Sequence, residues 1–417
     1  MGKVPFILAA ALAVISCSGR SETAVLWTDR AEFAVYAEYF NTSQDLHKVE
    51  TRYFKSPAAE LAAAAEFPDI ISGRWLKNTA TRSFFTPLDT IFNKKILSRD
   101  DFYPRLLDLG KIDNKQYFLP VAFNIPALIF AREKGGLLSS PFTIGLEEIK
   151  KLGKDHNVET GAAINTPGAW SRMGFSPVWD DEFLFITAGL FNTNFREGNP
   201  IAWDAEALEG AVAYIRSWVD EANAGIQQVE DFSFKYFFDP PAKLAASERI
   251  LFAYMDSSEL FTLTEEQRSA LDFRWIAERN NIPVSEDTVF YGICRKGKAK
   301  KAAAAFTRWF FQQETQQLLL ESSRNKGMNE TSFGIGGGFS AIRGVTEQVF
   351  PKFYPILLGH MPQGQLLSPP NVLPRNWNRL KEQVILPYLH ERLHSTENNV
   401  FPSLEQRIFD WYMLNRE

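Results

Sequence analysis

The sequence predicts an α/β protein built from two lobes. From Thr23 onward, short apolar segments alternate with longer segments of helical periodicity, which is typical of an α/β fold with a largely parallel sheet. The chain has 417 residues, and at about 100–200 residues per domain this length fits two lobes or three. No long linker separates the halves, so we expect two lobes that share several chain crossings.

Composition narrows the functional class. The 45 Lys+Arg and 50 Asp+Glu residues give a net charge of −5, which argues against nucleic acid as a partner because phosphate binding needs clustered cations. Aromatic residues make up 14% of the chain, against two Cys and five His. Thiol or histidine catalysis therefore has few possible locations, whereas the composition suits an aromatic-rich binding protein.

The first part of the mature chain predicts alternating strands and helices. Apolar runs predict strands at Ala24–Trp27, His47–Arg52 and Asp69–Ile71, and helical spacing predicts helices at Glu32–Phe40 and Ala58–Phe67. Two strands, Tyr117–Pro120 and Ala127–Phe130, flank a proline-containing crossing.

The second part continues the pattern with longer helices. Strands are predicted at Ile250–Ala253 and Thr288–Cys294, and helices at Leu146–Lys154, Glu182–Phe191, Ala205–Ala222, Lys300–Leu320 and Asn378–Leu393. We interpret Cys294 as a core residue within its strand.

The N-terminus predicts export. Lys3 precedes the apolar run Val4–Ile15, which is too short to span a bilayer but fits a secretory signal core. The run ends in Ser16-Cys17 and resembles the bacterial lipobox, whose Cys is lipidated; the alternative is a plain signal peptide with an incidental Cys. We expect residues 1–16 to be a signal peptide and 17–23 a lipidated linker. Cys17 would then hold the protein at the bacterial membrane, facing the periplasm or the cell exterior.

Several segments in order carry a family resemblance. They are the lipobox, Leu26–Arg30, Phe67–Ile71, Leu119–Pro126, Val289–Leu320 and Pro369–Pro374 with Trp377. Together they resemble the extracellular solute-binding proteins of bacterial ABC importers, in the sugar-binding, maltose-binding-protein-like branch. The resemblance implies a ligand cleft between two lobes that close by hinge motion. It implies residues 24–124 and 286–335 for the first lobe, and 125–285 and 336–417 for the second.

Loops after strands of the first lobe supply the first ligand candidates, because α/β proteins bind ligands at strand carboxyl ends. Aromatic faces suit sugar rings, and charged groups make strong hydrogen bonds to hydroxyls. Asp29 has an alternative role as a helix cap, and Arg74 could be a solvated charge. The resemblance implies ligand contacts by Thr28, Asp29, Arg30, Ser72, Arg74, Trp75 and Asn124. Family members often carry a carboxylate where this chain has Asn124, which leaves the identity of the sugar open.

The second lobe supplies the remaining candidates. Asp180 could instead cap the next helix, Asp256 could serve a turn, and Trp377 could be a core residue. The candidate residues here are Trp179, Asp180, Tyr254, Asp256, Trp377 and Lys381. Lys381 lies one helical turn from Trp377 and would suit an acidic or phosphorylated solute.

These features predict a non-catalytic, lipid-anchored monomer that needs no cofactor or metal. Its expected partners are a carbohydrate or polyol ligand, ABC permease subunits and the membrane that holds the anchor, with no nucleic acid among them.

Three motifs offer alternatives. His390-Glu391-Arg392-Leu393-His394 matches H-E-x-x-H, which would make the protein a secreted zinc metallohydrolase, although it lies at the end of a helix that contains a proline. Gly292 to Lys298 approaches a P-loop, but Ala299 replaces the Ser/Thr that binds Mg²⁺. Gly334–Gly338 lacks the third glycine of a dinucleotide fingerprint, and we interpret it as a mobile loop between the lobes.

Overall fold

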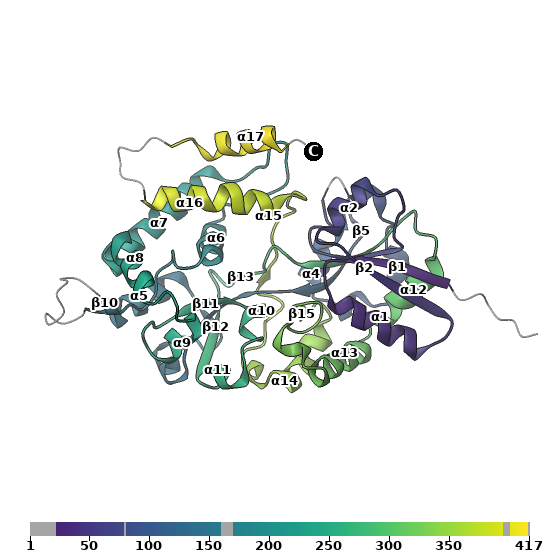
Figure 1. The fold of residues 1–417 in the computed structure, drawn as a ribbon, viewed down its shortest axis with the longest axis horizontal. Coiled ribbons are helices and arrows are strands. Elements are labelled where there is room, and N and C mark those ends of the chain that lie inside the picture. Colours follow the sequence, from purple (N-terminus) through teal and green to yellow (C-terminus); the bar gives the residue numbers. More distant parts are fainter. Residues whose placement is uncertain (1–21, 79–80, 160–169, 395–400, 416–417) are drawn as a thin grey trace, which may run out of the picture.

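The computed structural model describes residues 22–78, 81–159, 170–394 and 401–415. The predicted signal peptide and Cys17 lie outside these residues. The described chain forms two α/β lobes, one carrying the N-terminal strands and the other most of the middle of the chain (Figure 1). In the described ranges, we find no helix whose length and apolar character would let it cross a membrane.

The first lobe is built on a six-stranded sheet with the order β15-β6-β14-β3-β1-β2. Its strands are β1 (Glu22–Thr28), β2 (His47–Tyr53), β3 (Ile70–Gly73), β6 (Leu119–Phe123), β14 (Val289–Ile293) and β15 (Phe339–Ser340). β1 pairs in parallel with β2 and β3, whereas β14 is antiparallel to β3 and β6. The prediction of a largely parallel sheet is therefore wrong, because β14, which enters from the second lobe, and β15 both run antiparallel to β6.

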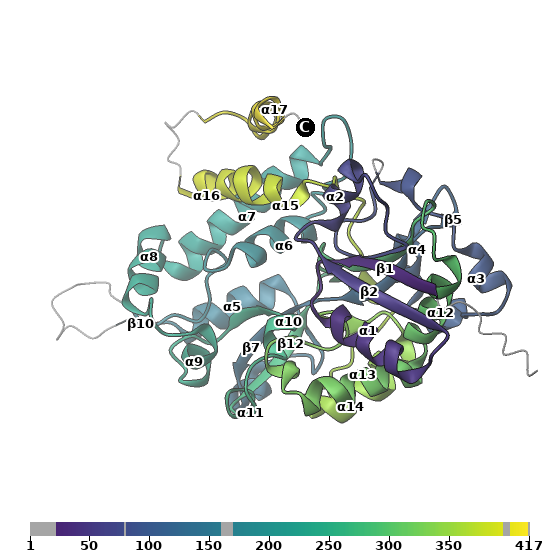
Figure 2. The ribbon, with the colours of Figure 1, turned by 45° about the vertical axis from the view of Figure 1, so that its right-hand side comes forward.

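Alternating side chains of β1 place two helical layers on this sheet. Leu26 faces a cluster with Phe33 of α1 (Glu32–Ser43) and Phe306 of α12 (Lys300–Phe310), whereas Trp27 faces Leu61 on the other side. Leu61 belongs to α2 (Pro57–Ala63), which lies across the sheet from α1 in both views (Figures 1 and 2).

The second lobe contains a four-stranded sheet with the order β11-β7-β12-β8. Its strands are β7 (Pro126–Ala131), β8 (Thr143–Ile144), β11 (Ala253–Asp256) and β12 (Leu271–Ile276). Around it lie α5 (Leu146–His156), α6 (Asp181–Leu190), α7 (Ala205–Asn223), α8 (Ile226–Lys235) and α9 (Pro241–Ala246).

The C-terminal helices form an outer layer over α6 and α7 (Figure 2). These are α15 (Trp377–Leu380), a π-helical turn (Lys381–Ile385), α16 (Leu386–His394) and α17 (Leu404–Leu414). Trp377, Leu389 and Trp411 share one apolar cluster with residues of α6 and α7. This layer therefore belongs to the second lobe.

The chain passes between the lobes more than once. One crossing joins β6 to β7, and another joins β13 (Ile282–Pro283) to β14 through the segment 284–288. β16 (Leu367–Ser368) pairs in parallel with β13 beside this second crossing. β15, which the sequence placed in the second lobe, pairs with β6 in the first.

Two predicted helices differ in detail. The predicted helix Lys300–Leu320 is two helices, α12 and α13 (Gln313–Asn325), because the chain turns at Phe311 to bury that ring. The helix predicted at Ala58–Phe67 ends at Ala63. Cys294 is buried at the end of β14, and burial raises the pKa of its thiol to about 12, so its interpretation as a core residue is confirmed.

Candidate functional site

A cavity of about 440 Å³ lies between the two lobes. The loop after β3 contributes one wall, the end of β11 contributes the opposite side, and α15 with the π-helical turn closes a third side. Six of the residues predicted from the sequence line it: Arg74, Trp75, Tyr254, Asp256, Trp377 and Lys381.

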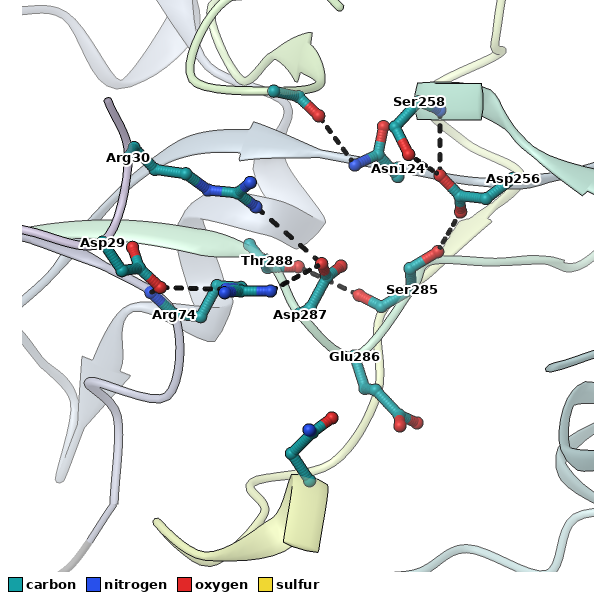
Figure 3. Close-up of polar contacts among 12 residues, drawn as sticks. Asp29, Arg30, Arg74, Asn124, Asp256, Ser258, Ser285, Glu286, Asp287 and Thr288 are labelled. Carbon is teal, nitrogen blue, oxygen red and sulfur yellow. Dashed lines mark hydrogen bonds and ion pairs between the residues drawn. The ribbon is translucent and has the colours of Figure 1, made fainter. Parts of the chain in front are cut away.

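Arg74 and Trp75 approach the cavity from the first lobe. Trp75 adopts a positive φ of 60°, which turns the chain directly after β3. Arg74 Nε donates to Asp29 Oδ2 at 2.9 Å, as Figure 3 shows, and the Asp29 side chain is buried. A Cβ on Gly73 would lie 2.8 Å from Asp29 Oδ1, so only glycine leaves room for this carboxylate. Asp29 itself does not line the cavity but orients Arg74 toward it.

Arg30 lies behind Arg74 and faces the second crossing. Its Nη2 lies 3.8 Å from Asp287 Oδ2, and Arg74 Nη1 lies 4.0 Å from the same oxygen (Figure 3). These separations are too long for hydrogen bonds, and Asp287 is one-third exposed. Asp287 thus supplies a loosely held anion between two arginines at the edge of the cavity.

Two first-lobe candidates are used within the fold. Thr28 Oγ1 accepts a hydrogen bond from Arg30 N at 3.0 Å, which fixes the turn after β1. Ser72 is fully buried within β3, where it pairs with Tyr291 of β14 and Thr28 of β1. Neither lines the cavity.

Asn124 lies in the first crossing and joins both lobes. Its Nδ2 donates to the Gly337 carbonyl at 3.0 Å, and its Oδ1 accepts from Ser257 Oγ at 2.8 Å. With 5% of its surface exposed, Asn124 does not line the cavity. The structure places it in the hinge.

Tyr254 and Asp256 form the second-lobe side of the cavity. Asp256 Oδ1 accepts from Ser258 N and Oγ, both at 2.9 Å, and Oδ2 accepts from Ser285 Oγ at 2.8 Å (Figure 3). Burial, together with the nearby Asp287 charge, raises the pKa of Asp256 to about 7 against the lowering effect of these hydrogen bonds. Asp256 therefore titrates near neutrality while tying β11 to the second crossing.

Trp179 and Asp180 lie outside the cavity lining. Trp179 stacks on Phe232 of α8, with ring centroids 5.7 Å apart. Asp180 Oδ1 accepts from Glu182 N at 2.9 Å and Phe183 N at 3.0 Å, which makes it the N-cap of α6. Burial raises the pKa of Asp180 to about 6.

Trp377 and Lys381 meet one buried carboxylate that the sequence did not suggest. Trp377 Nε1 donates to Glu286 Oε1 at 2.8 Å, and Lys381 Nζ lies 2.6 Å from the same oxygen. Lys381 also pairs with Glu182 Oε2 at 2.7 Å and lies 4.1 Å from the centre of the Phe185 ring. Burial alone would lower the pKa of Lys381, but the two carboxylates outweigh it and raise the pKa above its usual value.

Sequence reasoning also missed an acidic crossing and an amide-rich rim. The crossing consists of consecutive polar residues that each contact a different partner: Ser285 contacts Asp256, Glu286 contacts Lys381, and Asp287 lies near Arg30 and Arg74. The only signal in the sequence for these contacts is the position of the segment between two strands. The rim carries the side chains of Asn192, Asn194, Asn281, Asn371 and Asn378, together with Phe185.

The alternative motifs have other structural roles. His390 pairs with Asp181, His394 with Glu230 and Glu391 with Arg407, each pair being on the surface of the second lobe. Within the described ranges, no three His, Cys, Asp or Glu side chains are grouped to bind a metal. At the P-loop-like segment, Asp69 Oδ1 already accepts from Ala299 N at 2.7 Å. Gly334–Gly338 is a buried turn, and its Gly337 carbonyl accepts a hydrogen bond from Asn124 Nδ2. Its interpretation as a mobile loop is therefore wrong.

Comparison with known proteins assigns the fold. The sequence matches no protein-family model and no curated protein. An ABC substrate-binding protein of Listeria monocytogenes, in complex with cycloalternan, is 12% identical, with a TM-score of 0.61 over 94% of this chain and 99% of that one. A maltose/maltodextrin-binding domain of Bdellovibrio bacteriovorus, bound to maltotriose, is 15% identical, with a TM-score of 0.56 over 95% of this chain and 100% of that one. A sugar-binding protein of Xanthomonas citri is 12% identical, with a TM-score of 0.60 over 94% and 96% of the two chains. The chain therefore has the two-lobed fold of these sugar-binding proteins.

Proposed function

We propose that the protein is a non-catalytic receptor that captures a carbohydrate or related polyol in the cavity between its lobes and delivers it to an ABC permease. The observation that carries the proposal is a 440 Å³ cavity lined from both lobes by aromatic rings and hydrogen-bonding side chains. A ligand that contacts both lobes favours the closed arrangement, because binding shifts the population toward the state it contacts best. The likeness to sugar-binding proteins supports this proposal.

The lining suits a sugar better than an apolar ligand. Trp75 and Phe185 contribute aromatic surface that can contact the C–H groups of a sugar ring, whereas the asparagine rim offers both donors and acceptors to hydroxyl groups. Arg74 and Lys381 are already paired with carboxylates, so the cavity presents polarity with little uncompensated positive charge.

A ligand screen tests the proposal. Purified protein lacking the N-terminal 21 residues is tested by thermal shift against sugars, oligosaccharides and polyols, because a ligand that binds only the native state raises the melting temperature. Trp75→Ala is expected to weaken binding of an active ligand by on the order of 10–100-fold, through loss of stacking area. Phe238→Ala, at a ring that is 94% exposed, is the control and should bind as the wild type. Absence of any stabilising saccharide, or unchanged binding by Trp75→Ala, contradicts the proposal.

We also propose that Cys17 is lipidated and anchors the protein. The short apolar run before Ser16-Cys17 supports this. In cells expressing the full chain, Cys17→Ala should move the protein from the membrane fraction to the soluble exported fraction. Cys294→Ala is the matched control, and equal membrane association of both variants would disprove the anchor.

A further inference from the structure

A second chamber lies beside the cavity. Beyond Trp75 the space narrows to a neck of about 30 Å³ between the lobes, where Leu109 and Phe290 face Val372 and Leu373. It then widens into an outer chamber of about 400 Å³. Asn371 borders the cavity, the neck and the outer chamber, so the three spaces adjoin one another.

The outer chamber is basic. Lys77, Arg82 and Lys111 line it from the first lobe, and Arg196 lines it from the second. Of the described residues that line it, Glu197 is the acidic one. A ligand in this chamber would thus meet cations from both lobes.

Two of these cations have no anionic partner among the residues that the structure describes. Arg82 pairs with Asp113 and Lys111 with Asp108, both on the exposed surface. Burial lowers the pKa of Lys77 to about 8, and no described residue forms a hydrogen bond or an ion pair with its ammonium group. Within the described part of the chain, the Arg196 guanidinium makes one long contact, 3.5 Å from Nη1 to the Asn194 carbonyl. A half-buried ammonium group without a partner is costly, and an anion supplied by a ligand would relieve that cost.

In the main cavity the two less exposed cations, Lys381 and Arg74, are already paired, and the third, Arg279, is exposed. Lys381 has two carboxylates within 2.7 Å, and Arg74 has Asp29 at 2.9 Å. An acidic group placed there would also meet Glu286 and Asp287. Lys381 is therefore already neutralised by its own carboxylates, and the outer chamber is the better place for an acidic group.

We propose that the outer chamber binds an anionic group at one end of an extended saccharide, with Lys77 and Arg196 as its main ligands and neutral units of the same molecule in the main cavity. The inference rests on the proposed function for the saccharide part. Because the neck is formed by residues of opposite lobes, its width depends on how far the lobes close, so an extended molecule can enter when they are apart.

Sulfate serves as the first probe because it tests the chamber without a sugar. Thermal shift and calorimetry are run at constant ionic strength, with sodium chloride replaced by sodium sulfate. Lys77→Met and Arg196→Gln should each weaken sulfate binding at least about fivefold, through loss of a charge-assisted contact. Lys77→Arg should retain binding, and Lys301→Met, at an exposed lysine of α12, is the charge-matched control. If sulfate stabilises every variant equally, the stabilisation is the general effect of sulfate on proteins, and the proposal is overturned. The proposal is also overturned if sulfate does not stabilise the wild type.

Matched saccharides serve as the second probe. Trisaccharides of galacturonate, glucuronate and mannuronate are compared with their neutral methyl esters. For at least one pair, the wild type should bind the acid on the order of tenfold more tightly than the ester. Lys77→Met should reduce this preference to about twofold or less while leaving ester binding unchanged.

The two arms separate the proposals. If no saccharide binds but sulfate depends on Lys77 and Arg196, the proposed function fails and the anion chamber stands. If neutral saccharides bind and the acids bind no better, the sugar function stands and the assignment of the outer chamber to an acidic saccharide is overturned.

Discussion

At the scale of single residues, Glu286 organises the cavity wall. One carboxylate oxygen accepts from the Trp377 indole and pairs with the Lys381 ammonium; Trp377 and Lys381 are buried, and the Glu286 side chain is 15% exposed. A buried charge is stable only when its partners remain, since desolvation otherwise costs several kcal/mol. Glu286 also belongs to the segment that crosses between the lobes, so it ties the wall of the cavity to the hinge.

Neutralising Glu286 should destabilise the protein. Glu286→Gln keeps an acceptor for Trp377 but removes half of the charge that surrounds Lys381, and we expect a loss of about 2 kcal/mol in the free energy of unfolding. Urea denaturation measures this loss. Adding Lys381→Met should restore part of it, which a double-mutant cycle detects. Glu382→Gln, at an exposed neighbour, should change stability by no more than about 0.5 kcal/mol; an equal effect would contradict the role of Glu286.

Asp256 makes stability depend on pH. Its pKa rises from 3.8 to about 7 on folding, so between these values the folded state binds the proton more tightly than the unfolded state. This contribution to stability is complete below pH 4 and is lost as the pH rises through 7. Asp256→Asn removes the ionisation. Its free energy of unfolding, relative to that of the wild type, should therefore increase by about 1–3 kcal/mol between pH 5 and pH 8.

Urea denaturation at pH 5 and pH 8 checks this difference. Other carboxylates also titrate, so the informative quantity is the variant minus the wild type at each pH. Asp231→Asn, at an exposed position of α8, should give the wild-type pH dependence. A difference between Asp256→Asn and wild type that does not change with pH would disprove the assignment.

At the scale of elements, α17 supports the cavity wall from outside. Trp411 is 7% exposed, packs in the cluster that contains Trp377 and Leu380, and donates to Gln383 Oε1 at 2.8 Å. Gln383 lies in the π-helical turn that begins at Lys381. The last helix therefore packs directly on the segment that carries two cavity residues.

Shortening Trp411 tests this support. Trp411→Ala should lower the free energy of unfolding by about 3–5 kcal/mol, because it removes a large buried ring and leaves a cavity. Phe409→Ala, on the same helix at 57% exposure, should have little effect. Chemical denaturation of both variants makes the comparison, and equal losses would show that α17 contributes to stability in some other way.

The local pattern predicted most elements but not their directions or partners. Period-two and helical spacing placed β1, β2, α6 and α7 within a few residues, since each has one face against a core. The same pattern cannot show that β14 inserts between β3 and β6, because strand order depends on how distant segments pack. It also could not show that Lys300–Leu320 breaks, since both Phe310 and Phe311 are buried.

The site was predictable only in part, for a related reason. Arg74, Trp75, Tyr254, Asp256, Trp377 and Lys381 line the cavity, whereas Thr28, Ser72, Asn124 and Asp180 hold turns, strands, the hinge and a helix end. Cavity-lining and turn-fixing residues are the same polar types after the same strands. Whether such a side chain lines the cavity or fixes a turn depends on the partner that folding places beside it. Asn124, for example, is held by Ser257, a residue far away in the sequence.

At the scale of the whole molecule, ligand binding should bring the lobes together. The cavity has walls on both lobes, so a saccharide that contacts both favours closure. Small-angle X-ray scattering with a saccharide from the screen should show a smaller radius of gyration than without it. Trp75→Ala at the same ligand concentration should show less compaction, and an unchanged radius in the saturated wild type would contradict hinge closure.

The position of β14 bears on how the chain acquires its structure. Without β14, the first sheet separates into β1, β2 and β3 on one side and β6 with β15 on the other. The strand that joins them follows the whole middle of the chain, so a ribosome must synthesise about 290 residues before the N-terminal sheet can close. Contacts between such distant segments form slowly. The N-terminal lobe therefore cannot complete its sheet until most of the chain has been made, although its first strands are made at the very beginning.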